Sequence, residues 1–138
     1  MFSRRAQALS IKGALPQPGS ELEALLAIHM QVDGLPTPVR QHVLRVWEPV
    51  EHMKPCVPHT AVAHDFRLDF AWPQLGKLAV EVDGEVHRIR DRFHGDIRRN
   101  ALILLAGWRV LHVDGRRVRS GDAVRWVRLF LETFREPV

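Results

Sequence analysis

The chain has 138 residues, a single cysteine, 46% hydrophobic and 26% charged residues, and a formal net charge of +4. This length suits one domain with a buried core, the lone Cys56 excludes both an internal disulfide and a four-cysteine zinc site, and no apolar run approaches the ~20 residues of a membrane span. We therefore expect a folded cytoplasmic protein that has no signal peptide, no membrane segment and no disulfide bond.

The first predicted element is a helix over about 21–31. Ser20 is a suitable N-cap, Glu23 follows three residues later as in a capping box, and apolar residues continue at helical spacing. The preceding residues 1–19 contain two glycines and two prolines and show no period. They indicate a flexible basic tail in front of one domain over 20–138.

Three strands are predicted next. β-Branched and aromatic residues indicate a strand over 39–47, and three prolines indicate a long loop over 48–61. Alternation of apolar and polar residues predicts strands over 63–72 and 77–83, joined by a turn at 73–76. Each of these two strands is expected to bury one face, with inward residues Phe66, Leu68, Phe70, Leu78, Val80 and Val82.

Two helices and a strand complete the domain. A helix over 91–106 ends at Gly107, a short strand covers 108–113, residues 114–121 form a polar connection, and a last helix covers 122–134. The apolar side expected of the first helix is Ile97, Ala101, Leu104 and Leu105, and that of the last is Ala123, Val124, Val127, Phe130 and Leu131. We expect the tryptophans to pack in the core: Trp47, Trp72, Trp108 and Trp126. The predicted fold is α/β (α+β), in the order α-β-β-β-α-β-α, with a mixed central sheet flanked by helices.

Three carboxylates fall on the polar faces of the two alternating strands. Period two places Glu81 and Asp83 on one side of their strand, and a short hairpin brings Asp69 beside them. Like charges this close repel, so we expect them to bind a divalent cation, and hard oxygen ligands suit Mg²⁺ or Mn²⁺. Such an ion supports phosphodiester hydrolysis. In the alternative interpretation these acids face solvent and pair with arginines such as Arg67.

Further polar residues follow the acids closely enough to join the same site. Gly84 permits a turn that folds His87 back over the carboxylates, where it acts either as a general acid or base or as an ion-pair partner. Asp96, Arg99 and Asn100 lie on the polar side of the next helix, where either one of them reaches the same site or all three are ordinary surface residues. Glu23 either caps its own helix or projects into the site, and both interpretations stay open.

The positive charge is concentrated in one stretch of the chain. Residues 86–119 contain nine arginines and three acidic residues, a local net charge of +6. Because a guanidinium group makes paired hydrogen bonds to phosphate, this stretch favours nucleic acid as a partner, although a solvated basic surface is the alternative. The arginines expected to contact nucleic acid are Arg67, Arg88, Arg90, Arg92, Arg99, Arg116, Arg117 and Arg119.

Several of these segments together resemble a known family of nucleases. They are the helix with Glu23, RLDFAWP, KLAVEVDGEVH, an Asp96-x-x-Arg99 pair ahead of Gly107, and GWRVLHVDGRRV. This pattern, over about 20–135, resembles the very-short-patch-repair-like branch of the PD-(D/E)XK nucleases, whose signature is E-D-x-H-D. The resemblance implies a restriction-endonuclease-like core, Mg²⁺-dependent DNA cleavage, and a catalytic set matching Glu23, Asp69, Glu81, His87 and Asp96.

Two departures from the family pattern shape the functional prediction. Asp83 stands where the family's D…E-x-K motif has lysine, so positive charge must come from His87 or an arginine. A single cysteine cannot reproduce the structural zinc site of the mismatch-nicking members. We therefore expect a Mg²⁺- or Mn²⁺-dependent DNA endonuclease or nickase that uses Asp69, Glu81 and Asp83 as metal ligands. The alternatives are an inactive nucleic-acid-binding module or an accessory subunit of a phage or defence assembly, with RNA as substrate and homodimer formation also open.

Overall fold

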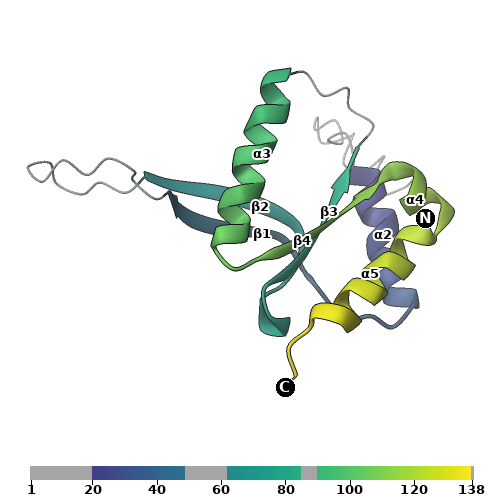
Figure 1. Ribbon diagram of the computed structural model, residues 1–138. Coiled ribbons are helices and arrows are strands. Elements are labelled where there is room, and N and C mark those ends of the chain that lie inside the picture. The colour runs from purple at the N-terminus through teal and green to yellow at the C-terminus, as the bar shows by residue number, and fades with distance from the viewer. Residues whose placement is uncertain (1–19, 49–61, 85–89, 138) are drawn as a thin grey trace, which may run out of the picture.

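The computed structural model describes residues 20–48, 62–84 and 90–137 (Figure 1). The element order confirms every predicted strand and all three predicted helices, with bounds that differ by a few residues at most. The elements are α2 (Ser20–Val32), β1 (Val39–Glu48), β2 (Val62–Trp72), the 3₁₀ turn η1 (Pro73–Leu75), β3 (Leu78–Asp83), α3 (Arg90–Leu105), β4 (Arg109–Asp114), α4 (Gly115–Ser120) and α5 (Asp122–Phe134).

The four strands form one mixed sheet in the order β1-β2-β3-β4. The first three strands are antiparallel neighbours, and β4 pairs parallel to β3 because α3 carries the chain back across the sheet. Figure 1 shows α3 against one face of the sheet and α2 and α5 against the other. The predicted mixed sheet flanked by helices is therefore confirmed.

Both faces of the sheet are buried in its centre, so the expectation of one buried face per strand was wrong. One core cluster joins the strands to α2, α4 and α5, and it includes Leu26, Phe70, Trp72 and Val127. A smaller cluster under α3 contains Leu68, Ala71, Ala79, Ile103 and Trp108. Strands that are covered on both sides lose the simple apolar and polar alternation.

The pleat of the first two strands reverses at one position. Leu68 packs in the cluster under α3, whereas Phe70, two residues later, packs in the cluster on the opposite face. The expectation that both lie on one face was therefore wrong. In β1 the residue opposite the reversal is Gln41, which has a φ of +51°, and Gln41 and Asp69 are absent from an otherwise continuous register. This paired irregularity changes the direction of the Asp69 side chain relative to a regular strand.

Helix α3 packs with a different side from the predicted one. Ile103 is 1% exposed, whereas Leu105 is 72% exposed. The predicted apolar side lies on the surface: Ile97, Ala101, Leu104 and Leu105. The side that meets the sheet has Leu102 and Ile103 but also the charged Arg99, and a hydrophobic pattern cannot identify a buried stripe that contains arginine.

Two smaller expectations are also corrected. The predicted polar connection after β4 contains the short helix α4, which buries Val118 and has Asp114 as its N-cap. Trp72 and Trp108 are buried as expected, but Trp47 and Trp126 are 59% and 50% exposed. In the described segments no helix has the length and apolar character needed to span a bilayer.

Candidate functional site

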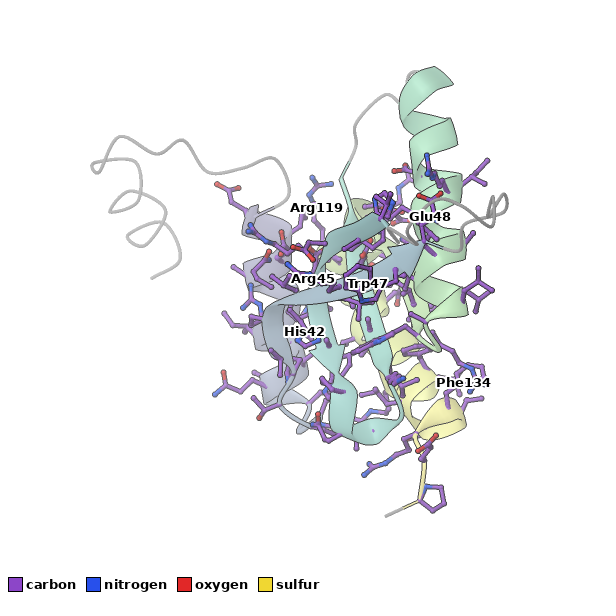
Figure 2. The ribbon with its side chains drawn as sticks, turned by 90° about the vertical axis from the view of Figure 1, so that its left-hand side faces the viewer. His42, Arg45, Trp47, Glu48, Arg119 and Phe134 are labelled. Carbon is purple, nitrogen blue, oxygen red and sulfur yellow. The ribbon has the colours of Figure 1, made fainter. Side chains whose placement is uncertain are left out.

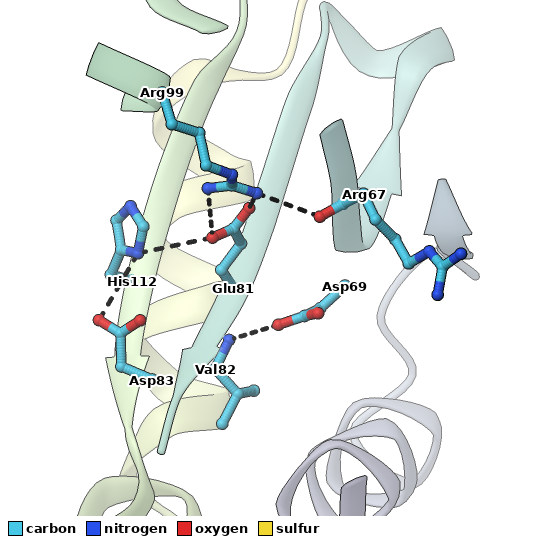
Figure 3. A network of polar contacts seen from close by, with 7 residues as sticks. All are labelled: Arg67, Asp69, Glu81, Val82, Asp83, Arg99 and His112. Carbon is cyan, nitrogen blue, oxygen red and sulfur yellow. Dashed lines mark hydrogen bonds and ion pairs between the residues drawn. The ribbon is translucent and has the colours of Figure 1, made fainter. Parts of the chain in front are cut away.

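The site begins where β2 and β3 separate. These strands pair only from Phe70 to Trp72, opposite Val80 to Leu78, and the ladder stops at the next position, where Asp69 and Glu81 would face each other. Beyond this point the Val82 N–H has a side-chain acceptor in place of a β2 carbonyl: it donates a hydrogen bond of 2.9 Å to Asp69 Oδ2 (Figure 3). The fork between the strands thus contains two carboxylates.

Arg99 enters the same fork from α3. Its Nη1 and Nη2 donate to the two Glu81 carboxylate oxygens at 3.0 and 2.5 Å, and Nη2 also donates to the Arg67 carbonyl at 3.1 Å. Figure 3 shows the guanidinium group between Glu81 on β3 and the backbone of β2. Glu81 is 8% exposed and is the one buried charged residue in the described part of the chain. Such a bidentate pair compensates for much of the cost of burying the carboxylate.

A histidine that sequence reasoning did not identify lies beside these acids. His112 on β4 has its Nδ1 3.6 Å from Asp83 Oδ2 and 3.9 Å from Glu81 Oε2. The contact with Asp83 raises the pKa of the imidazole although burial acts against it. His112 lies beside Glu81 because the two residues are register partners in the parallel pairing of β3 and β4. The sequence does not reveal which strands pair, so it could not identify His112.

The Glu23 side chain contacts Asp69, so it projects from α2 toward the fork. Its Oε1 accepts a 2.6 Å hydrogen bond from Gln41 Nε2, and its carboxyl group shares a hydrogen bond with Asp69. Burial, and then the charge of Asp69, raise the pKa of Glu23. Burial also raises the pKa of Asp69, against the effect of the Val82 N–H. The shared hydrogen bond raises the pKa of Glu23 and lowers that of Asp69.

An open cavity of about 290 Å³ lies on the α3 side of the fork. Its lining consists of Glu81, Asp83, Asp96, Arg99, Asn100 and His112. Asp96 therefore reaches the site as expected. Glu81 and Asp83 share this cavity, whereas Asp69 lies across the fork beside Glu23 of α2. Among the described residues no three His, Cys, Asp or Glu side chains form a group able to hold an ion in this arrangement.

The remaining predicted residues are distributed as follows. His87 and Arg88 lie outside the described residues, as do the side chains of Arg90 and Arg92. The Arg67 side chain points away from Arg99, although its carbonyl is bound there (Figure 3). On α4, Arg117 pairs with Asp114 at 3.1 Å and lies over the Trp126 ring at 4.9 Å, and its neighbours Arg116 and Arg119 are exposed.

No protein-family model, curated protein or solved structure matches this chain.

Proposed function

We propose that this chain is a metal-dependent DNA endonuclease or nickase with a restriction-endonuclease-like core. The observation that carries the proposal is the position of Asp69 and Glu81 on either side of the point where β2 and β3 diverge. Further acids adjoin this point from three other positions: Glu23 on α2, Asp83 at the end of β3 and Asp96 on α3. A mixed sheet between helix layers is consistent with such a core.

The electrostatics of the fork support a bound cation. Burial and neighbouring carboxylates raise the pKa values of Glu23 and Asp69, which means that negative charge is unfavourable there without compensation. Asp69, Glu81 and Asp83 are the residues that would hold Mg²⁺ or Mn²⁺, and because they do not surround one point in the present arrangement, Glu81 would have to leave Arg99 for them to do so. When bound, the ion polarises a phosphoryl oxygen and lowers the pKa of a coordinated water.

Two side chains on the cavity wall have roles that the family pattern gives to lysine. Arg99 supplies a positive charge beside Glu81, and after release from the carboxylate it is placed to bind a phosphate oxygen. His112, held by Asp83, is placed to carry a proton to or from the cavity. His87 keeps the role that the resemblance implies for it.

Cleavage of supercoiled plasmid DNA tests this proposal. Wild type is expected to nick or cut it with Mg²⁺ or Mn²⁺ and to stop when EDTA is added. Asp69→Asn and Glu81→Gln are each expected to reduce the rate at least about 100-fold, as is usual for loss of a metal ligand or its support. Glu132→Gln, an exposed acid on α5, is the matched control and should cut normally. Cleavage that is absent from plasmid, branched and single-stranded DNA, or unchanged in Asp69→Asn, would refute the enzyme.

One observation favours a second function. Arg99 donates hydrogen bonds to both Glu81 oxygens and so neutralises this carboxylate, as expected in a catalytically silent nucleic-acid-binding module that keeps the fold. That module would bind DNA in a salt-dependent way with the same Kd in Mg²⁺ and in EDTA. The enzyme instead predicts that Mg²⁺ binds the protein alone, which isothermal titration calorimetry measures directly.

A further inference from the structure

The first two strands extend beyond the rest of the sheet as a two-stranded ribbon. Because β3 pairs with β2 only from Phe70 onward, residues 42–48 and 62–68 pair with each other alone. Seven residues in each strand span about 20 Å. Figure 1 shows this part of β1 and β2 projecting away from α2 and α5.

One face of the ribbon is backed by α3. Leu44 and Phe66 pack in the cluster under this helix, and the Arg99 guanidinium lies over the Phe66 ring at 5.5 Å. At the far end Glu48 pairs with Arg98 of α3 and with His64 of the ribbon itself. The ribbon is therefore supported against the body of the protein, and the Glu48 carboxylate is directed to this covered side.

No segment that the structure describes covers the opposite face of the ribbon. Trp47 and Val43 are 59% and 57% exposed, and the residue paired with Trp47 across the strands is the small Ala63. Arg45 and Arg67 are exposed on the same face. Figure 2 views the molecule toward the projecting end of the ribbon and labels Arg45 and Trp47 on it. Large apolar and cationic side chains thus form one open surface.

The charge of this face suits a polyanion. Its one carboxylate, Asp65, is paired with Arg45 at 2.8 Å, so the second arginine, Arg67, gives the face a net positive charge. Along β2 this face leads toward Asp69, two residues after Arg67, which contacts Glu23 of α2 on the side of the sheet away from α3. A ligand lying on the ribbon would therefore approach the fork from the Asp69 side, opposite the cavity beside α3.

We infer that the uncovered face of this ribbon docks in the major groove of duplex DNA. The inference rests on the proposed function and narrows its substrate to B-form duplex. The major groove of B-DNA, about 12 Å wide, admits a two-stranded β-ribbon, whereas that of A-form RNA is too deep and narrow for side chains to read. Arg45 and Arg67 contact phosphates at the groove edges, and Trp47 and Val43 make apolar contacts with thymine methyl groups.

Fluorescence anisotropy with a labelled 20-base-pair duplex in EDTA tests the inference without cleavage. Trp47→Ala is expected to raise the Kd about tenfold. Arg67→Gln is expected to reduce the slope of log K against log salt by about one. Arg135→Ala, an exposed arginine at the end of α5, is the matched control and should bind like wild type. Circular dichroism melts establish that each variant is folded.

Substrate modification provides the second arm. A duplex whose major groove is filled by glucosylated hydroxymethylcytosine is expected to bind at least tenfold more weakly, and duplex RNA should not compete. The inference is overturned if Trp47→Ala and Arg67→Gln bind normally, if the filled groove has no effect, or if Trp47→Ala only dissociates a dimer in sedimentation. Loss of cleavage with ribbon-dependent binding intact would instead refute the proposed enzyme and leave the docking surface standing.

Discussion

Arg99 determines the state of the one buried carboxylate in the described chain. Its guanidinium group lies between the diverging strands β2 and β3. It donates two hydrogen bonds to Glu81 on β3 and a third to the Arg67 carbonyl on β2. Both side chains are largely inaccessible to solvent, so this pair is screened less than a surface ion pair. Arg99 therefore stabilises the fork. In the proposed enzyme its guanidinium group releases Glu81 and binds a phosphate oxygen of the substrate.

Removing this guanidinium should expose the cost of the buried carboxylate. Arg99→Met is expected to lower the free energy of unfolding by about 3 kcal/mol, because Glu81 keeps its burial and loses its partner. Millimolar Mg²⁺ should recover part of this loss by binding the freed acid. Urea unfolding with and without Mg²⁺ measures both effects, with Arg135→Ala as the control. An Arg99→Met protein as stable as wild type would contradict the structural role of the pair.

His112 should make stability depend on pH. Its pKa in the folded protein is raised above 6.5 by the contact with Asp83, so the protonated ring stabilises the fold. This stabilisation is complete below the unfolded-state pKa of about 6.5 and is lost as the pH rises through the folded-state value. The stability difference between wild type and His112→Gln should therefore shrink from pH 5.5 to pH 8.5 in urea titrations. A difference that is constant, or that grows with pH, would show that Asp83 does not hold a protonated ring.

At the scale of elements, the stability of α4 depends on its N-cap, Asp114. This helix carries Arg116, Arg117 and Arg119 directly after the end of β4. The Asp114 carboxylate accepts a 2.8 Å hydrogen bond from the Arg117 N–H and also pairs with the Arg117 side chain. Asp114→Ala is expected to destabilise the protein by about 1 kcal/mol, whereas Asp114→Asn, which keeps the accepting oxygen, should lose much less. Thermal melts of the two variants check this order. Equal losses would mean that the ion pair, and not the cap, is the stabilising contact.

The sequence predicts elements better than it predicts their orientation. The strand bounds, the mixed sheet and three of the helices follow from alternation, helical spacing, prolines and glycines. The pleat reversal does not, because it depends on Gln41 in an unusual backbone conformation opposite Asp69. The side of α3 that is buried was also missed, since Arg99 lies on it. The sequence did not predict helix α4, because a six-residue segment whose one buried apolar side chain is Val118 has almost no periodic signal.

The candidate site was predictable to the extent that it follows from the hairpin of β2 and β3. Asp69 and Glu81 meet at the fork, as their spacing indicates, and Asp96 reaches the cavity. The partners of these acids were not predictable. His112 enters through the parallel pairing of β3 and β4, and the contact of Glu23 with Asp69 depends on how α2 packs on the sheet.

At the scale of the whole molecule, the fork is where three layers meet. Helix α2 brings Glu23 from one side, α3 brings Asp96 and Arg99 from the other, and the sheet supplies Asp69 and Glu81 between them. The ribbon of β1 and β2 leads from this point along an uncovered, positively charged face. A duplex on the ribbon and a cation in the fork would bring a phosphodiester bond to the Asp69 side of the fork.

The anomalous scattering of a crystal soaked in Mn²⁺ tests the central claim most directly. The proposed enzyme predicts an ion between β2 and β3, within about 2.0–2.3 Å of oxygens from Asp69 and Glu81, with Arg99 moved off Glu81. Asp69→Asn crystals treated in the same way should show no ion at this position. A fork without manganese in the wild-type crystal, in which Arg99 still holds both oxygens of Glu81, would contradict a metal-dependent nuclease.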